Sequence, residues 1–296
     1  MTCYCKRALK ILHNVDDCLG RRGKQSLQAG DKERDMKKLF LFDIDGTIAI
    51  DDDLLDGTVD LLHYIDRIGG KAIFITNNST KSRKAYIEKF ARWQIPTVAG
   101  QFITASYASV VYLRKHHRQD KIFVLGTASL VAELREEGFL VTEEADSDTD
   151  AVLVGFDNEL TYSKVEKACR LLLTHPDMPY LATNPDLCCP TRFGSVPDCG
   201  AICRLLECAV KRSPVFLGKP NPIIVDICLA QTGFTREETL VVGDRLYTDI
   251  ACGINGGVDT AVVFTGEASP EDCIETEYKP TYQFASVREL YRWCMK

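Results

Sequence analysis

A short apolar run that stops at two carboxylates constrains the fold of this chain more than any other segment. Residues 39–42 are Leu-Phe-Leu-Phe, and Asp43-Ile-Asp-Gly-Thr47 follows at once. A run this short, bounded by a turn signal, is typical of a strand buried on both faces. Side chains alternate along an extended segment, so Asp43 and Asp45 leave the strand tip on one side. Two interpretations fit this segment: a site for a metal and covalent chemistry, or an Asp-Gly turn after an ordinary strand.

From residue 39 onward, predicted strands alternate with predicted helices. This alternation is typical of an α/β fold with parallel sheets covered by helices. Asp43, Thr76 and Asp244 all stand where an apolar run stops, so we expect these strand tips to converge in one sheet. The predicted strands are 39–43, 71–76, 121–125, 151–154, 179–182, 215–217, 239–243 and 260–263. The predicted helices are 54–67, 80–92, 104–117, 128–137, 161–173, 199–211, 220–231 and 246–254.

Three domain-level segments are predicted. Residues 119–213 repeat the alternation without acidic tips, so they are predicted to form an inserted, smaller α/β domain. Residues 36–118 and 214–296 then form the core domain, and the insert would act as a lid over its strand tips. Residues 1–35 lie outside the pattern and are predicted to be an N-terminal extension with a flexible connector. Because Met36 directly precedes the first strand, either translation starts there or 1–35 is an appended tail.

Composition restricts the class of partner. The formal net charge of −6 gives no general attraction for nucleic acid or an anionic membrane. The apolar runs are too short to span a bilayer, and no secretory signal is expected. The 13 cysteines are odd in number and lie mostly in apolar helical patterns. A reduced, cytoplasmic protein is therefore expected rather than a disulfide scaffold.

Three further segments place polar residues at strand or helix ends. Thr76-Asn-Asn-Ser79 could hold phosphate oxygens, because a helix is predicted to begin close by. Lys219, between a glycine and a proline, could balance the charge of a phosphate or of a carboxylate nucleophile. Asp244 and Asp249 follow another apolar strand. Each segment also has a plain structural reading, as a helix cap, a loop lysine or a turn acid.

Their combination resembles the haloacid dehalogenase (HAD) superfamily, whose motifs are DxD, a Ser/Thr at a strand end, a Lys and GD(x)nD. The likeness is closest to its NagD-like and p-nitrophenyl phosphatase subfamily (IIA), and it runs from about Lys37 to Leu290. Asp198 stands where that family usually has glycine, and Cys189 where pyridoxal phosphate phosphatases have histidine. The matching segments are Thr76-Asn-Asn-Ser79, Thr183-Asn-Pro-Asp186, Gly218-Lys-Pro-Asn-Pro222 and Gly243-Asp-Arg-Leu-Tyr-Thr-Asp-Ile250.

The resemblance implies a Rossmann-like, doubly wound core with an inserted cap of the C2 type. It implies a Mg²⁺-dependent phosphatase of small phosphate monoesters (sugar, nucleotide or glycolate phosphates) that forms an aspartyl-phosphate. It also implies that caps pair into a homodimer. The implied catalytic residues are Asp43 as the nucleophile and Asp45 as the acid/base. The implied Mg²⁺ ligands are Asp43, the Asp45 carbonyl and Asp244, with Asp249 in support. The implied phosphate-binding residues are Thr76, Asn77, Asn78 and Lys219.

Two alternatives belong to other functional classes. A phosphotransferase or mutase of the same superfamily normally has a helical cap soon after the first motif, whereas only ten residues separate Gly46 from Gly57 here. A non-catalytic module that binds phosphorylated metabolites would be expected to lose Asp43, Asp45 or Lys219, and all three are present. A phosphatase is therefore the leading prediction.

Overall fold

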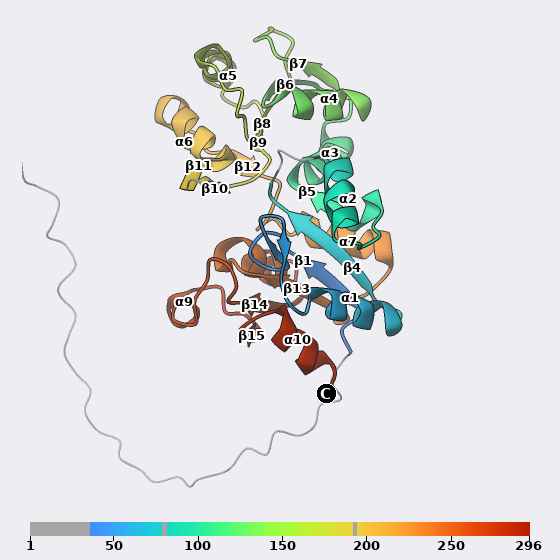
Figure 1. Ribbon diagram of the computed structural model, residues 1–296. Helices are drawn as coiled ribbons and strands as arrows, with labels where there is room; N and C mark the ends of the chain where they lie inside the picture. The colour runs from blue at the N-terminus through green and yellow to red at the C-terminus, as the bar shows by residue number, and fades with distance from the viewer. Residues whose placement is uncertain (1–35, 79–81, 192–193) are drawn as a thin grey trace, which may run out of the picture. The chain divides into compact units, whose positions relative to one another are not determined.

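A six-stranded parallel sheet forms the base of the fold (Figure 1). The computed structural model describes residues 36–78, 82–191 and 194–296. The strand order is β15-β14-β13-β1-β4-β5, and every neighbouring pair is parallel. The strands are β1 Leu39–Phe42, β4 Lys71–Thr76, β5 Phe102–Thr104, β13 Thr239–Gly243, β14 Asp259–Val263 and β15 Tyr282–Phe284.

Helices cover both faces of this sheet because alternate strand residues point to opposite sides. Phe40 and Phe42 pack with residues of α1, α2 and α10. Leu39 and Leu41 pack on the other face with residues of α3, α7 and α8. The helices are α1 Thr58–Arg67, α2 Arg83–Arg92, α3 Ala105–His116, α7 Ile223–Thr232, α8 Ala251–Asn255 and α10 Val287–Cys294, with a short α9 Asp272–Glu275.

A second parallel sheet has five strands in the order β12-β9-β8-β6-β7. Helices α5 and α6 pack on one face, and α4 packs on the other together with Val110 and Leu113 of α3. The strands are β6 Lys121–Leu125, β7 Leu140–Thr142, β8 Ala151–Val154, β9 Tyr180–Ala182 and β12 Val215–Phe216. The helices are α4 Ala128–Glu136, α5 Tyr162–Thr174 and α6 Cys199–Val210.

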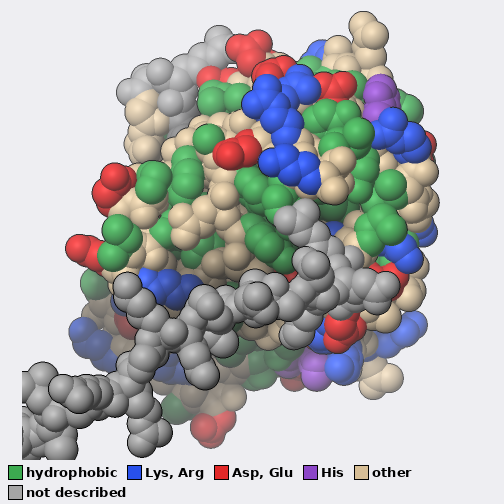
Figure 2. All heavy atoms as spheres, turned by 90° about the horizontal axis from the view of Figure 1, so that it is seen from below, with side chains coloured by type: hydrophobic (Ala, Val, Ile, Leu, Met, Phe, Trp, Pro, Cys, Tyr) green, Lys and Arg blue, Asp and Glu red, His purple; other side chains and the backbone are tan. Residues whose placement is uncertain are grey.

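Shorter elements complete the two layers. Two hairpins, β2/β3 (Ala49–Ile50 and Asp53–Leu54) and β10/β11 (Cys188–Thr191 and Gly194–Pro197), project from the segments that follow β1 and β9. A 3₁₀ turn spans Ala99–Gln101, and a single π-helical turn spans Leu246–Ile250 before α8. Acidic, basic and apolar side chains are interspersed on the face that Figure 2 shows.

The predicted fold class is confirmed: strands and helices alternate into a doubly wound core with a second α/β layer inserted. One detail bears on the predicted domain division. Strand β12 pairs with β9 in the second sheet, so that sheet reaches Phe216, beyond the predicted boundary at residue 213. The predicted extension at 1–35 lies outside the described residues. Within the described part of the chain, no helix has the length and apolar character that a membrane span requires.

Candidate active site

Three strand tips of the larger sheet meet at the candidate site, as predicted. Asp43 follows β1, and its N–H donates to the carbonyl of Val242 in β13, 2.8 Å away. The parallel register places Phe42 beside Val242 on one side and beside Phe74 on the other. Thr76 at the end of β4 and Asp244 just after β13 are therefore brought to the same edge as Asp43. Ligand crevices of open α/β sheets lie at this edge.

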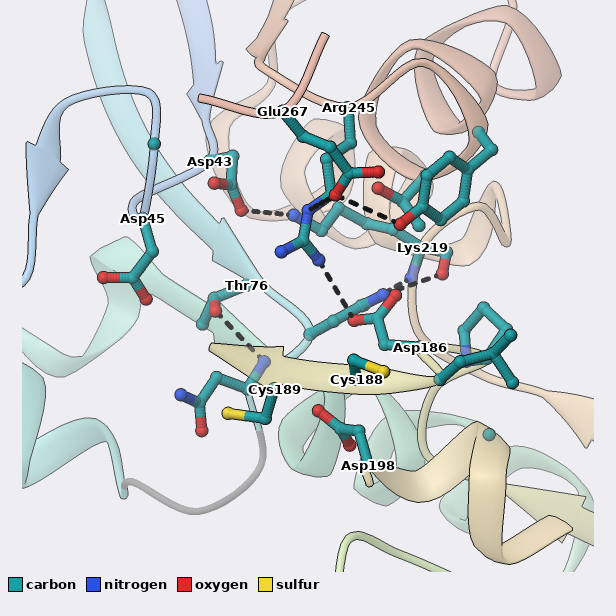
Figure 3. Close-up of a pocket in the computed structure, with 18 of the residues that line it drawn as sticks. Asp43, Asp45, Thr76, Asp186, Cys188, Cys189, Asp198, Lys219, Arg245 and Glu267 are labelled. Atoms are coloured by element: carbon teal, nitrogen blue, oxygen red, sulfur yellow. Dashed lines mark hydrogen bonds and ion pairs between the residues drawn. The ribbon is translucent and has the colours of Figure 1, made fainter. Parts of the chain in front are cut away.

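Lys219 lies at the centre of this edge, and its side chain is 3% exposed. Its Nζ is 2.5 Å from Asp43 Oδ1 and 2.6 Å from Asp249 Oδ1, and it also donates to the Ile75 carbonyl at 3.3 Å. Figure 3 shows Asp43 turned toward this ammonium group. The lysine thus balances part of the charge of two buried carboxylates.

The backbone of Lys219 is held by one predicted phosphate-binding residue, Asn77. The Lys219 N–H donates to Asn77 Oδ1 at 2.8 Å, and Asn77 Nδ2 donates to the Lys219 carbonyl at 2.9 Å. Asn184, in the segment after β9, donates to the Asn77 carbonyl at 2.8 Å. The Asn77 side chain is therefore already used to position Lys219. Thr76 accepts the Asn78 N–H at 3.1 Å and stays at the cavity wall (Figure 3).

Three acids at this edge could hold a metal ion. Asp43, Asp244 and Asp249 each offer a carboxylate oxygen, and these oxygens lie within 4.8 Å of one another. Oxygen-only donors suit hard divalent cations such as Mg²⁺. The three carboxylates outnumber the single ammonium group by two charges, so a divalent cation would neutralise the cluster. The donor set and its charge fit such an ion.

Asp244 is tightly enclosed. Its Oδ1 accepts from Thr47 Oγ1 at 3.2 Å and its Oδ2 from the Glu267 N–H at 2.8 Å. The backbone can pack this closely against the carboxylate only because glycines stand there. A Cβ on Gly46 would lie 2.6 Å from Asp244 Oδ2, and one on Gly266 would lie 2.0 Å from it. Gly46 also has φ +93°, which favours glycine.

Burial shapes the protonation of the cluster. It raises the pKa of Asp43 well above its usual value, an effect that the Lys219 ammonium partly offsets and that Asp249 and Asp244 reinforce. Burial and the Asp249 charge raise the pKa of Asp244 to about 6. Burial alone would lower the pKa of Lys219, but Asp249 and Asp43 together raise it, so this lysine stays protonated. A bound cation would favour the ionised carboxylates.

Asp45 stands apart from this cluster. Figure 3 shows Asp43 and Asp45 leaving the same segment in different directions. The Asp45 carboxylate accepts from Lys89 Nζ at 3.3 Å, whereas the third acid grouped with Asp43 and Asp244 is Asp249. The assignment of Asp45 to the metal through its carbonyl, with Asp249 in support, stays a prediction.

These residues line one end of a cavity of about 960 Å³. The other end is formed by segments next to the second sheet, which contribute Asp186, Cys188, Cys189 and Asp198 (Figure 3). Both positions that depart from the family pattern, Cys189 and Asp198, thus face the cavity. Burial raises the pKa of the Asp198 carboxyl to about 6.

Among the cavity residues that were not predicted as site residues, three charged ones bear on its chemistry: Lys89, Asp186 and Arg245. Arg245 Nε is 2.9 Å from Glu267 Oε2, and its Nη1 is 3.9 Å from Asp186 Oδ2, so it links the two ends of the cavity. Arg245 and Asp186 belong to the motifs that carried the resemblance. Lys89 had a subtler signal: it follows Tyr86 by three residues, on the apolar face of a helix.

Comparisons with known proteins agree with this geometry. Two family models match, one described as haloacid dehalogenase-like hydrolase over residues 40–140 and one as HAD-hydrolase-like over residues 216–290. The acid sugar phosphatase of Staphylococcus aureus is 33% identical over 252 residues, which cover 85% of this chain and 96% of that protein.

Solved structures give the same result. A 4-nitrophenylphosphatase from Thermotoga maritima has a TM-score of 0.81 and 36% identity, covering 87% of this chain and 97% of its own. NagD from E. coli K-12 has a TM-score of 0.78 and 30% identity, and the match covers 86% of this chain and 98% of NagD. The chain therefore belongs to the haloacid dehalogenase-like hydrolases and resembles their NagD and p-nitrophenyl phosphatase members.

Proposed function

We propose that this protein is a Mg²⁺-dependent phosphatase that hydrolyses small phosphate monoesters through an aspartyl-phosphate on Asp43. The observation that carries the proposal is the buried cluster in which Asp43 pairs with Lys219 and lies beside Asp244 and Asp249. The names of the similar proteins support phosphatase chemistry. The proposed Mg²⁺ ligands are Asp43, the Asp45 carbonyl and Asp244, with Asp249 in support.

The chemistry follows from the charges at the site. Hydrolysis of a phosphate monoester is extremely slow in water, and an anionic nucleophile must approach an anionic ester. Lys219 contributes positive charge beside Asp43. When bound, a divalent cation supplies further positive charge that stabilises the transferring phosphoryl group.

Two proton-transfer steps would complete the reaction. An Asp43 oxygen forms a bond to phosphorus while the ester P–O bond breaks, and Asp45 donates a proton to the leaving oxygen. Asp45, now a carboxylate, then takes a proton from water that attacks the phosphorus. The P–O bond to Asp43 breaks, phosphate is released and the Asp43 carboxylate is restored. Thr76 and the backbone of Asn77 and Asn78 are proposed to hold the phosphoryl oxygens.

The substrates are proposed to be sugar, nucleotide or glycolate phosphates. A cavity of about 960 Å³ is large enough for any of these. The insert, predicted as residues 119–213, is proposed to be the cap. Because β12 pairs with β9 of its sheet, we place the end of the proposed cap at Phe216. We also propose a cytoplasmic location, which fits the free state of the described cysteines, and pairing of caps into a homodimer.

Phosphate release from a panel of monoesters, with and without Mg²⁺, tests this proposal. The wild type is expected to release phosphate only with the metal, and Asp43→Asn to release none. Asp66→Asn, on the exposed surface of α1, is the matched control and should behave as wild type. Transfer of phosphate to an added sugar in place of water would favour the phosphotransferase. Absence of turnover on every ester, with binding retained, would favour the non-catalytic module and overturn the proposal.

A further inference from the structure

Lys89 is a buried cation that the proposed mechanism does not use. It lies on α2, on the face that also carries Tyr86 and Phe90, and only 3% of the residue is exposed. Its Nζ is 3.3 Å from Asp45 Oδ1 and 5.0 Å from the centre of the Trp93 ring. A lysine buried to this extent needs a compensating partner.

The partner is Asp45, and the dependence runs both ways. Among the described residues, Lys89 is the one group that hydrogen-bonds or ion-pairs with the Asp45 side chain. That side chain is 39% exposed and stands on the segment after β1, so little packing restricts its rotamers. Lys89 Nζ, 3.3 Å from Asp45 Oδ1, is therefore the contact that can fix the orientation of this carboxyl group.

A second contact ties α2 to the same segment. Trp93, at the end of α2, donates from Nε1 to the Asp52 carbonyl at 2.7 Å. Asp52 belongs to the β2/β3 hairpin that follows Asp45. The end of α2 thus holds this segment at two points, and the cation–π contact with Trp93 fixes the Lys89 stem.

Each of the two acids therefore has its own lysine. Asp43 pairs with Lys219 in the largely buried cluster, and Asp45 pairs with Lys89 at the cavity wall. We propose that Lys89 is a positioning residue that holds the Asp45 carboxyl in the orientation needed for proton transfer to the leaving group. This inference rests on the proposed phosphatase function and on the role of Asp45 within it.

The dependence of kcat/KM on the leaving group distinguishes a positioning role of Lys89 from a purely structural one. An alkyl phosphate must receive a proton as its alkoxide leaves, whereas p-nitrophenolate leaves readily without one. The kcat/KM value reports the steps up to the first irreversible one, so it isolates attack by Asp43 from the later hydrolysis. Loss of a correctly placed acid should therefore lower kcat/KM for the alkyl ester alone.

The experiment measures kcat/KM for glucose 6-phosphate and p-nitrophenyl phosphate under saturating Mg²⁺. Lys89→Met should lower the value for the alkyl ester by roughly 10²-fold and that for the aryl ester by less than about 3-fold. Asp45→Asn should show the same pattern with a larger alkyl loss. Lys89→Arg, which keeps a charged donor, should recover most of the alkyl activity. Lys84→Met, at an exposed position of the same helix, should match wild type.

Circular dichroism and thermal unfolding establish that the variants are folded. If Lys89→Met does not fold, Lys89→Gln replaces it, because glutamine keeps an N–H donor without the charge, and the same loss confined to the alkyl ester is expected. Equal losses for both esters, or no loss for either, would overturn the inference while leaving the phosphatase proposal intact. A wild type inactive on both esters would instead overturn the proposed function, and this inference with it.

Discussion

The ammonium group of Lys219 lies 2.5 Å from Asp43 Oδ1, although 176 residues separate the two in the chain. The pair joins the first strand of the core to the segment that follows β12. Because Asp249 lies on the other side of the ammonium group at 2.6 Å, the lysine is shared between two buried carboxylates. The charge balance of the site depends on this one side chain.

Replacing Lys219 should therefore damage both activity and stability. Lys219→Met leaves Asp43 and Asp249 buried without their counter-charge, and the free energy of unfolding at pH 7 should fall by about 3–5 kcal/mol. kcat/KM should fall by at least roughly 10²-fold, as when a preorganised charge is removed from a transition state. Urea unfolding and phosphate-release kinetics measure the two effects. Lys115→Met, at an exposed position on α3, is the control, and equal stability of the two variants would contradict the account.

Metal binding should stabilise the fold through Asp244. At a Mg²⁺ concentration 100 times its Kd, the free energy of unfolding of the wild type should rise by about 2.7 kcal/mol. Asp244→Asn removes one of the carboxylates and should lose most of this increase. Thermal unfolding across a Mg²⁺ titration, with EDTA as the zero point, measures it. An undiminished Mg²⁺ effect in Asp244→Asn would show that the ion binds elsewhere.

Gly266 should be essential for the same site. A Cβ at this position would lie 2.0 Å from Asp244 Oδ2, so Gly266→Ala must displace the carboxylate. We expect a loss of Mg²⁺ stabilisation and a fall in kcat/KM of roughly 10²-fold, as for other displacements of about 1 Å. Gly100→Ala is a matched control, because a Cβ there meets nothing within 4 Å. Wild-type behaviour of both variants would argue against the tight enclosure of Asp244.

Asp198 should make stability depend on pH. Burial raises its pKa from the usual 3.8 to about 6, so the folded state binds this proton more tightly than the unfolded state. The free energy of unfolding should therefore fall as the pH rises from about 4 to about 6, by about 3 kcal/mol for this group alone. The stability of wild type minus that of Asp198→Asn, from denaturant unfolding at pH 4 and pH 7, isolates the effect. A difference that stays constant with pH would contradict it.

Much of the core could be predicted because its central strands are apolar runs that end in polar residues. The parallel strands that were missed, β5, β7 and β15, have three residues each and lie at sheet edges. Such strands bury few residues and leave a weak pattern. Helix α7 begins at Ile223 rather than at the predicted residue 220, because two prolines precede it. The place of β12 in the second sheet depends on its pairing with β9, which no local pattern encodes.

In the site too, features with a local sequence pattern could be predicted, and features that depend on pairing in the folded chain could not. The places of Asp43, Thr76, Lys219 and Asp244 in the fold could be predicted because each stands next to a strand or turn signal, while their roles stay predictions. Lys89 left only the weaker signal of a lysine on an apolar helix face, and its pairing with Asp45, 44 residues away, is not visible in the sequence. Spatial pairing of two charges is a property of the folded chain, whereas strand tips are visible in the sequence.

The most direct test of the central claim is to find the phosphoryl group on Asp43. Asp45→Asn should slow the attack of water more than the first transfer to an activated aryl ester, so the intermediate should accumulate with p-nitrophenyl phosphate and Mg²⁺. Rapid acid quenching, digestion and mass spectrometry would then locate the modification. We expect one phosphoryl group on the peptide that contains Asp43, and none in the Asp43→Asn variant. A burst of p-nitrophenol with the phosphoryl group on another residue, or on none, would contradict the account.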